Sequence, residues 1–389
     1  MSSATRDAAP DILRGFALWG IVVVNAGFFA ASVDLGVTAD ALTNWGDSLV
    51  AFLVFTLAQG KFYLIFSFLF GYSAHYILRN PVHGRRRWVM RSVGLIVLGI
   101  AHAVLLFIGD ILFLYGVLAL VLVAFYGRSR RAIVRWMAWI YGLFAFALTT
   151  LAALTWLGER QGVLTTTERL PAAVAFEETV VSGTYLESIA ARTEAWLSGG
   201  VLFVAFQGVL TLVAFLAGVL AARSGMLSAG GVTPTTLRRM LAWGLGLGLV
   251  VQTALGALWI TNLQSTTPSA TLDLIAVFGG FLTAPLLSAG YVGVILWVMQ
   301  SRPRVPGGLA PMGRMSLTVY LSQSLVLSLI FSAWGLGLHQ QVSYGGAVLI
   351  ALGVTAALAL CAHLWLSRVP RGPMEALLAR FSTLFLTKE

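Results

Sequence analysis

The sequence predicts an all-α protein, a polytopic bundle of transmembrane helices, and three observations lead to this prediction. Of 389 residues, 58% are hydrophobic and only 10% are charged, and the mean hydropathy is +0.88. The apolar residues form continuous runs of about 20 residues, the length that crosses a bilayer as a helix, without the alternation of barrel strands. Short arginine clusters separate these runs, as in the loops on one side of a membrane protein.

Taken in order, the apolar runs predict about ten spans in a single domain, 1–389. The first span extends from about Asp11 to Ala31. The stretch from Asp47 to Arg79 is too long for one straight span, so we expect an interfacial or re-entrant helix, a break at Gln59-Gly60-Lys61, and a span from Phe62. Further spans are expected at 88–108, 111–127, 134–157, 199–222, 240–262, 272–300, 314–334 and 344–366.

Charge orients the bundle, because lysine and arginine are enriched in cytoplasmic loops. Most arginines fall on one side of the predicted spans and most carboxylates on the other. We therefore expect both termini, with a tail at 367–389, in the cytoplasm and a long loop at 158–198 outside, with short helices around Ala172–Val180 and Tyr185–Leu197. Since the basic residues are topology signals first, the net charge of +10 does not indicate a nucleic acid partner.

Several site classes are excluded by residue usage. The single cysteine, Cys361, lies in an apolar run and rules out an intramolecular disulfide framework and a cysteine metal cluster. No motif for nucleotide triphosphate hydrolysis, haem or structural zinc is present, so no bound metal is expected. His83, His339 and His363 are interpreted as interface or packing residues.

The stretch from Arg85 to Gly116 predicts a membrane hairpin with polar residues at defined depths. It contains, in order, Arg85, Arg86, Arg87, Arg91, His102, Gly109-Asp110 and Tyr115. At a rise of about 1.5 Å per residue, His102 lies roughly 15–20 Å beyond Arg91, past the bilayer middle. An imidazole at that depth is costly unless it is paired or used, so it indicates a functional site. Asp110 follows about two turns later, too far for a His–Asp dyad on one straight helix.

Two spans repeat one polar spacing. Arg14 and Asn25 are eleven residues apart, as are Arg91 and His102, so each pair shares a helical face. Each span therefore has a guanidinium at its cytoplasmic edge and a polar group deep in its outer half. The alternative is that the arginines only mark helix ends, while Asn25 and His102 hydrogen-bond between helices as packing contacts.

Two further segments carry polar residues at membrane depth. Lys61 lies near the outer interface, where Asp110 is a candidate ion-pair partner, either structural or functional. Arg314 begins a span whose first half is unusually polar, with Ser316, Thr318, Tyr320, Ser322, Gln323 and Ser324. These side chains cover every helical face, so several must point into protein or water. The alternative is a tightly packed helix whose hydroxyls bond back to its own carbonyls.

The same residues give the chain a resemblance to the bacterial YeiB-like family, domain of unknown function 418. The matching segments are Asp11-Ile12-Leu13-Arg14-Gly15-Phe16-Ala17 with Asn25, Lys61-Phe62-Tyr63 with Phe66-Ser67-Phe68-Leu69-Phe70-Gly71, Gly313-Arg314-Met315, and Gly372-Pro373-Met374-Glu375. That family looks like a branch of the transmembrane acyltransferases, beside the acyltransferase-3 sugar O-acetylases and lysosomal heparan-α-glucosaminide N-acetyltransferase. The resemblance implies a multi-pass enzyme of the bacterial inner membrane that moves an acyl group from cytoplasmic acetyl-coenzyme A to an extracytoplasmic glycan or lipid.

One departure from the resembled families concerns the imidazole. Acyltransferase-3 proteins have a histidine eleven residues after the motif arginine, where this sequence has Asn25, as the lysosomal enzyme also does. The lysosomal enzyme's histidine in the following outer loop has no counterpart between Asn25 and Lys61. Either His102 supplies the imidazole from another helix, or the chemistry is different or lost.

The acyl-transfer interpretation gives each candidate residue a role. Coenzyme A phosphates need guanidinium groups, and the residues assigned to donor binding are Arg14, Arg91, Arg314, Gln323, Arg85 and Arg87. His102 is the candidate general base or nucleophile, and Asn25 or Tyr115 the oxyanion donor. Asp110 and Lys61 are the next candidates for a catalytic group.

Two other classes of function fit the same polar residues. A transporter or lipid flippase would use His102, Lys61 and Asp110 for proton or substrate coupling. A membrane scaffold would use them only for packing. Expected partners are acyl-coenzyme A, the acceptor and membrane lipids, together with a second copy of the chain in a homodimer.

Overall fold

The chain folds into a bundle of helices, seen in a computed structural model that describes residues 8–31, 38–163, 171–228, 230–302 and 306–383. The described residues contain no strand. The elements in order are α1 (Ala9–Ala30), η1 (Ala39–Ala41), α2 (Trp45–Leu53), η2 (Val54–Ala58), α3 (Phe62–Leu78), α4 (Gly84–Leu105), α5 (Leu112–Tyr126), α6 (Arg130–Arg160), α7 (Pro171–Ser182), α8 (Tyr185–Ala195), η3 (Trp196–Gly200), α9 (Val201–Arg223), α10 (Pro234–Arg239), η4 (Met240–Leu247), α11 (Gly248–Leu263), α12 (Ala270–Ser301), η5 (Pro306–Leu309), α13 (Ala310–Arg314), α14 (Ser316–Phe331), α15 (Tyr344–Leu366) and α16 (Pro373–Phe381).

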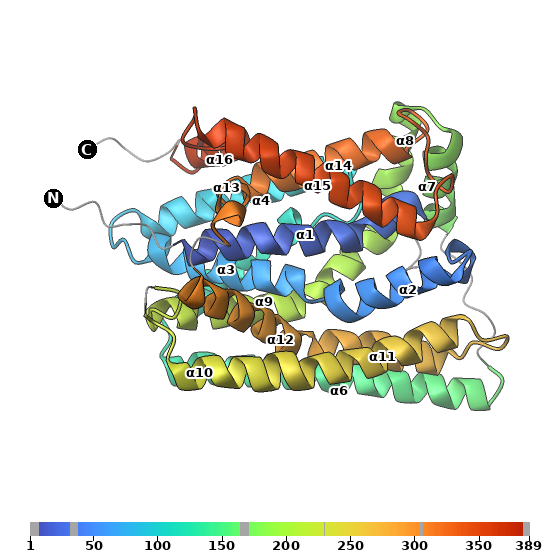
Figure 1. Ribbon diagram of the computed structural model, residues 1–389, viewed down its shortest axis with the longest axis horizontal. Coiled ribbons are helices and arrows are strands. Elements are labelled where there is room, and N and C mark those ends of the chain that lie inside the picture. Colours follow the sequence, from blue (N-terminus) through green and yellow to red (C-terminus); the bar gives the residue numbers. More distant parts are fainter. Residues whose placement is uncertain (1–7, 32–37, 164–170, 229, 303–305, 384–389) are drawn as a thin grey trace.

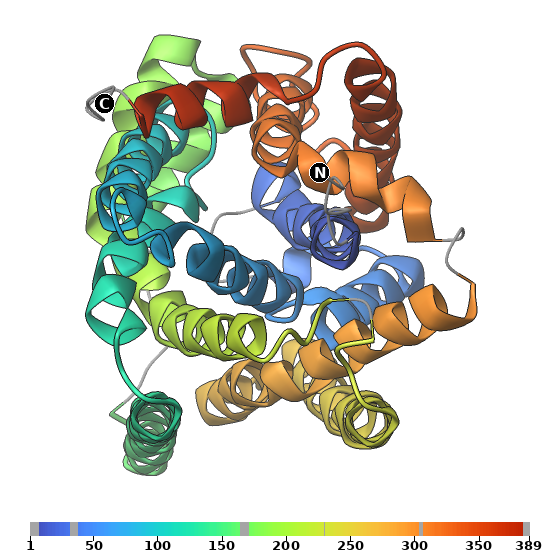
Figure 2. The same cartoon turned by 90° about the vertical axis from the view of Figure 1, so that its left-hand side faces the viewer.

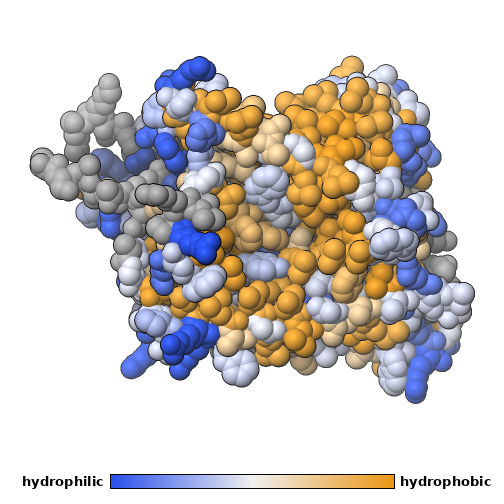
Figure 3. Space-filling view, viewed as in Figure 1, coloured by the Kyte–Doolittle hydropathy of each residue, from blue (hydrophilic) through white to orange (hydrophobic). Residues whose placement is uncertain are grey.

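The predicted all-α transmembrane bundle is confirmed. Within the described ranges, eight helical stretches are long and apolar enough to cross a membrane, and the bent pair α13–α14 makes a ninth. The shorter α5 falls on the span predicted at 111–127. The long helices run side by side along one axis (Figure 1), and the visible face has an apolar band between two more polar ends (Figure 3). The length and surface of the bundle therefore match those of a multi-pass membrane protein.

Helix α1 stands in the middle of the bundle and α6 at its rim (Figure 2). α1 packs against α3, α13, α14 and α15, and its residues Leu13, Ala17 and Leu18 are fully buried. In contrast, only 11% of the apolar window of α6 is buried inside the protein. Side chains on α1 are thus enclosed by protein, whereas most of α6 is left to face lipid.

The stretch Trp45–Leu78 is interrupted as predicted, while the interfacial or re-entrant position of its first part stays a prediction. It qualifies as one span of 34 residues, and α2 and α3 follow each other along the bundle (Figure 1). The predicted break at Gln59-Gly60-Lys61 is present between η2 and α3. The Lys61 ammonium donates to the Phe55 carbonyl at 2.7 Å, and the Ser288 hydroxyl donates to the Lys61 carbonyl at 3.0 Å. These two bonds give partners to polar groups at the interruption, as a break inside a bilayer would require.

The span predicted at 314–334 is bent rather than continuous. The helices α13 and α14 meet at 79° around Met315. On the α13 side, Gly313 lies directly on α1, since a Cβ atom there would be 1.7 Å from the Asp11 carbonyl oxygen. Only glycine permits this approach, so the Gly313-Arg314 segment lies against the start of α1 instead of continuing the axis of α14.

Two ends of the bundle are named for their contents. The cap end is covered by α7 and α8, which confirm the short helices predicted around Ala172–Val180 and Tyr185–Leu197. The arginine end is the opposite one, where α1 starts, α4 starts with Arg85–Arg87, and α13 and α16 lie (Figure 1). The first and last described helices therefore share one end, while the side of the membrane that this end faces stays a prediction.

The orientation can be tested by cysteine labelling in a Cys361→Ser background. Glu178 on α7 and Arg86 on α4 are both exposed and lie at opposite ends. We expect an impermeant maleimide to label the Glu178→Cys variant in spheroplasts and the Arg86→Cys variant only after lysis, because arginine-rich segments are retained in the cytoplasm. The reverse labelling pattern would contradict the orientation.

Candidate functional site

His102 and Asp110 form a buried hydrogen-bonded pair. His102 Nδ1 lies 2.7 Å from Asp110 Oδ2, and the two residues are 2% and 1% exposed. The other carboxylate oxygen, Oδ1, accepts the Phe113 N–H at 2.7 Å. The sequence prediction that these residues lie too far apart for a dyad is therefore wrong.

The error comes from the assumption of a straight helix up to the turn. α4 ends at Leu105, and the N–H groups of Leu106 and Phe107 both donate to the His102 carbonyl at 2.9 Å. This tight end sends the chain back through 106–111, so Asp110 returns toward His102 instead of rising two turns beyond it.

Gly99 allows α5 to begin close against α4. A Cβ atom at Gly99 would lie 2.1 Å from the Phe113 nitrogen and 2.7 Å from Asp110 Oδ1. Any side chain at Gly99 would therefore push apart the two groups that hold the carboxylate in place. The hairpin and the His102–Asp110 pair depend on this close approach of the two helices.

The second ring nitrogen of His102 is left free by the protein. Nε2 is buried and has no hydrogen-bond partner among the described residues. The imidazole packs between the rings of Phe107, at a centroid distance of 6.1 Å, and Tyr320, at 5.1 Å. Because the carboxylate bonds Nδ1, it favours the tautomer with the proton on Nδ1 and a lone pair on Nε2. The arrangement can thus supply a general base.

Tyr320 is a member of this site that sequence reasoning did not select. In the sequence it is one of six polar residues at the start of α14, yet in the structure its buried side chain lies against His102 and near the charge of Asp110. The bend at Met315 turns this part of α14 toward the hairpin, and no local sequence pattern reveals such a contact.

The cap end holds the last turn of α4 from outside. Three side chains from two other helices donate to its terminal carbonyls: Arg192 Nη1 to Val104 at 2.8 Å, the Tyr185 hydroxyl to Leu105 at 3.2 Å, and the Ser328 hydroxyl to Leu106 at 2.9 Å. These donors satisfy groups that every helix end leaves open. The chain segment carrying His102 is therefore fixed by α8 and α14 as well as by its own turn.

Two predicted catalytic residues are not bonded to the pair. Asn25 is half-buried on α1, one turn before Phe28 and Phe29, whose rings pack on Phe107 at 6.5 and 4.4 Å. It therefore lies close to the site without touching the imidazole through any hydrogen bond. The Tyr115 hydroxyl bonds the Ser67 hydroxyl at 2.7 Å and the Tyr63 carbonyl at 3.1 Å, so it joins α5 to α3.

The proposed ion pair between Lys61 and Asp110 is not formed. The Lys61 ammonium bonds the Phe55 carbonyl, at the end of the interrupted helix, while Asp110 bonds His102 and Phe113. A cation at the C-terminal end of a helix is stabilised by the carbonyl dipoles there. Lys61 thus belongs to the break in its own span.

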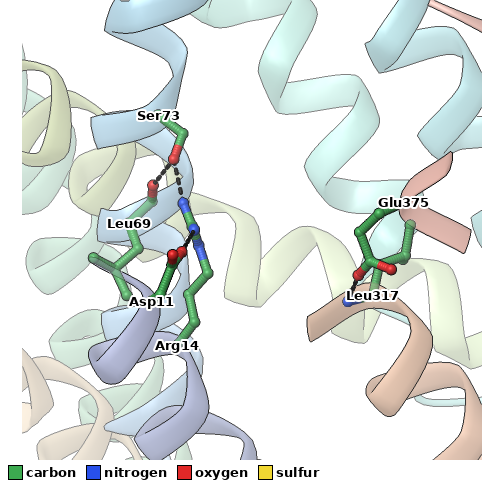
Figure 4. Close-up of polar contacts among 6 residues, drawn as sticks. All are labelled: Asp11, Arg14, Leu69, Ser73, Leu317 and Glu375. Atoms are coloured by element: carbon green, nitrogen blue, oxygen red, sulfur yellow. Dashed lines mark hydrogen bonds and ion pairs between the residues drawn. The ribbon is translucent and has the colours of Figure 1, made fainter. Parts of the chain in front are cut away.

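At the arginine end, predicted donor-binding residues from two helices lie together. Arg14 forms an ion pair with Asp11 at 2.9 Å and donates to the Ser73 hydroxyl (Figure 4). Arg91 on α4 lies within the electrostatic range of Arg14, Arg87 and Glu375. The structure therefore gathers Arg14, Arg87 and Arg91 around one region.

Glu375, in the C-terminal helix α16, lies near this group of arginines and binds the start of α14. Its carboxylate accepts the N–H groups of Leu317 and Thr318 at 2.7 and 3.2 Å and the Thr318 hydroxyl at 2.6 Å, which caps the start of α14 (Figure 4). The tail predicted at 367–389 therefore contains a docked helix, α16, whose Leu378 is buried against the core. No local sequence pattern indicates that this acid caps another helix.

The other donor-binding candidates are placed less centrally. Arg314 is exposed and donates to the Pro370 carbonyl at 3.2 Å, and Arg85 is exposed at the start of α4. Gln323 donates to the Thr355 hydroxyl at 2.8 Å inside the bundle, joining α14 to α15. The role of these three in donor binding stays a prediction.

The capping role of Glu375 predicts a loss of stability. Glu375→Ala removes an acceptor from the first N–H groups of α14, which should cost about 1 kcal/mol, as for other lost helix caps. Thermal unfolding in detergent, compared with Glu194→Ala on the exposed face of α8, measures it. Equal midpoints for the two variants would show that the cap contributes nothing.

Comparison with known proteins gives consistent results over almost the full length. The family described as "Protein of unknown function (DUF418)" matches residues 221–384. The chain is 29% identical to "Uncharacterized protein YxaH" of Bacillus subtilis (strain 168) over 390 residues, which cover 94% of this chain and 91% of the relative. It is 27% identical to "Uncharacterized protein YeiB" of Escherichia coli (strain K12) over 396 residues, covering 95% and 94%.

Proposed function

Since the chain belongs to the YeiB-like DUF418 family, we propose from its own residues that it is a transmembrane acyltransferase. The acyl group would pass from acyl-coenzyme A bound at the arginine end to a hydroxyl or amine of an acceptor that enters from the cap end. The acceptor would be a lipid or glycan outside the cytoplasmic membrane. The membrane fold rests on the long apolar helices, and the proposed activity rests on the geometry of the site.

The buried His102–Asp110 pair is the observation that supports this proposal most. An imidazole with a carboxylate on Nδ1 and an unpartnered Nε2 is the arrangement that activates hydroxyl groups in acyl transfer. Both residues lie inside the bundle, where an unused histidine–aspartate pair would be an expensive packing contact. Its position between arginine end and cap end suits a reaction across the membrane.

Each residue of the pair has a defined task. Acyl-coenzyme A, when bound, supplies a thioester carbonyl that an alcohol or amine can attack. His102 Nε2 takes the proton of the acceptor as its oxygen or nitrogen bonds to the acyl carbon, and returns that proton to the sulfur as the carbon–sulfur bond breaks. Asp110 holds the ring orientation and stabilises the imidazolium that exists between these two events.

The arginine end fits the charge of the donor. Arg14 and Arg91, from two helices, would hold phosphate oxygens, because guanidinium groups bind them with two parallel hydrogen bonds. Met312, Met315 and Val319 belong to the same buried cluster as Leu95 on α4 and Tyr320 beside His102. Binding would have to move them, and methionine is the side chain best able to change shape at small cost.

A transporter or flippase is the second candidate, and Lys61 favours it. This lysine is 1% exposed, lies at an interrupted span and has no carboxylate within ion-pair distance among the described residues. Interrupted helices with buried charges are common at transport sites. Coenzyme A that copurifies with the protein, identified by mass spectrometry, would favour the acyltransferase over this alternative.

The base role of His102 predicts a strong loss of activity. His102→Gln keeps a hydrogen-bonding side chain but cannot take up a proton, so label transfer from radioactive acetyl-coenzyme A to lipids and glycans of membrane vesicles should fall by about 10² or more. His363→Gln, on the exposed face of α15, is the control. Near wild-type transfer by the His102 variant, with transfer present in the control, would remove His102 as the base.

The donor site predicts a graded effect of the arginines. Arg14→Ala and Arg91→Ala should each weaken acetyl-coenzyme A binding roughly tenfold, the effect of losing a charged hydrogen bond of about 1.5 kcal/mol. Lysine at either position should restore only part of it, and the exposed Arg314→Ala should cost less. Calorimetry on detergent-solubilised protein measures this, with Arg135→Ala on α6 as control. Unchanged affinity in both alanine variants would show that acetyl-coenzyme A binds elsewhere.

A further inference from the structure

Arg192 is a buried cation without an acidic partner. It is 1% exposed, and no carboxylate of the described residues forms an ion pair with it. Its Nη1 donates to the Val104 carbonyl at 2.8 Å, its Nη2 makes a long 3.4 Å bond to the Ser188 hydroxyl, and its Nε has no partner. The guanidinium also faces the Phe176 ring at 5.5 Å.

Capping of α4 explains only one side of this guanidinium. The Val104 carbonyl accepts a hydrogen bond from Nη1 alone. Nε has no acceptor, and Nη2 makes only its long bond to the Ser188 hydroxyl. A buried cation costs several kcal/mol unless an anion and further hydrogen bonds compensate it. A neutral donor such as glutamine would cap the carbonyl at lower cost, so the charge itself indicates an anionic ligand.

The guanidinium borders a small cavity next to the His102–Asp110 pair. The cavity has a volume of about 20 Å³, and its lining includes Arg192, Phe28, Phe29, Phe107, Phe176 and Val180. Phe107 also packs on His102, so one ring separates the cavity from the proposed base. An arginine surrounded by aromatic and aliphatic side chains matches a molecule with an anionic group beside apolar carbon.

We propose that Arg192 and this cavity form the acceptor subsite and bind a phosphate group of the acceptor. The proposal rests on the acyltransferase function, because that function places the acceptor at the cap end. A phosphate presents two oxygens to Nε and Nη2, the pair of donors that the protein leaves open. The source of the phosphate is either a lipid headgroup or a soluble phosphate ester.

Entry of a phosphate requires α7 to move. A volume of about 20 Å³ holds roughly one water molecule. α7 is held over the cavity by the Ala333 N–H, which donates to the Val180 carbonyl at 2.8 Å, and by Gln340, which donates to Glu177 at 2.6 Å. α7 is therefore the cover of the subsite, and its displacement opens a path to Arg192.

The experiment measures phosphate binding without any acyl donor. Native mass spectrometry of the detergent-solubilised full chain would use dioleoylphosphatidylglycerol in one arm and glycerol 3-phosphate in the other, with dioleoylglycerol, which lacks a phosphate, for comparison. Wild type, Arg192→Gln and Arg192→Lys are compared with Arg160→Gln, an exposed arginine at the same end. The Val180→Phe variant fills the cavity and leaves Arg192 in place. It therefore tests the subsite even if Arg192→Gln does not fold.

We expect one arm to show binding that falls at least tenfold in Arg192→Gln or Val180→Phe, returns in part in Arg192→Lys and is unchanged in Arg160→Gln. The arm that responds identifies the lipid or the soluble source. Equal binding by wild type and both site variants, or no binding in either arm, would overturn the subsite. Since no acyl-coenzyme A is used, loss of the subsite is separable from loss of the acyltransferase proposal, which the His102 variant tests.

Discussion

The carboxylate of Asp110 is the constraint that organises the hairpin. It accepts a hydrogen bond from His102 on one oxygen and from the Phe113 backbone N–H on the other, so a single side chain ties the end of α4 to the start of α5. In a bilayer no water competes for these bonds, and a carboxylate left without them would be strongly destabilising. The tight end of α4, the glycine at position 99 and the bonds from the cap end all serve this one arrangement.

Two helices connect this hairpin to the opposite end of the protein. α4 carries Arg91 and Arg87 at the arginine end and His102 near the cap end. α14 begins under the Glu375 carboxylate, contacts His102 through Tyr320 and bonds Leu106 through Ser328. Both helices therefore reach from the arginine end to the groups that position the imidazole.

The positions of the helices were largely predictable from the sequence, because apolar runs of about 20 residues and arginine clusters report on the bilayer itself. The short helices of the cap were also predictable. What failed was the path of the chain between elements, namely the return at 106–111 and the bend at Met315. Both depend on contacts with distant segments, such as Gly313 on Asp11 and Ser328 on Leu106.

The candidate site was predictable only in part for the same reason. Depth along a helix selected His102 and Arg91, since a buried charge or imidazole is rare in a span. The same depth argument placed Asp110 about two turns beyond His102, because it assumed that α4 continues straight to Asp110. Tyr320, Glu375 and Arg192 were missed as site residues, since their importance comes from the partners that the fold brings to them.

The most direct test of the central claim is the tautomer of His102. Nitrogen NMR of protein labelled with ¹⁵N-histidine, with the His102 signals assigned by their loss in His102→Gln, reports which ring nitrogen carries the proton. The arrangement predicts a proton on Nδ1 and a lone pair on Nε2 at neutral pH, and a change of this pattern in Asp110→Asn. A proton on Nε2, or a spectrum that does not respond to Asp110→Asn, would contradict a carboxylate-oriented base in this protein.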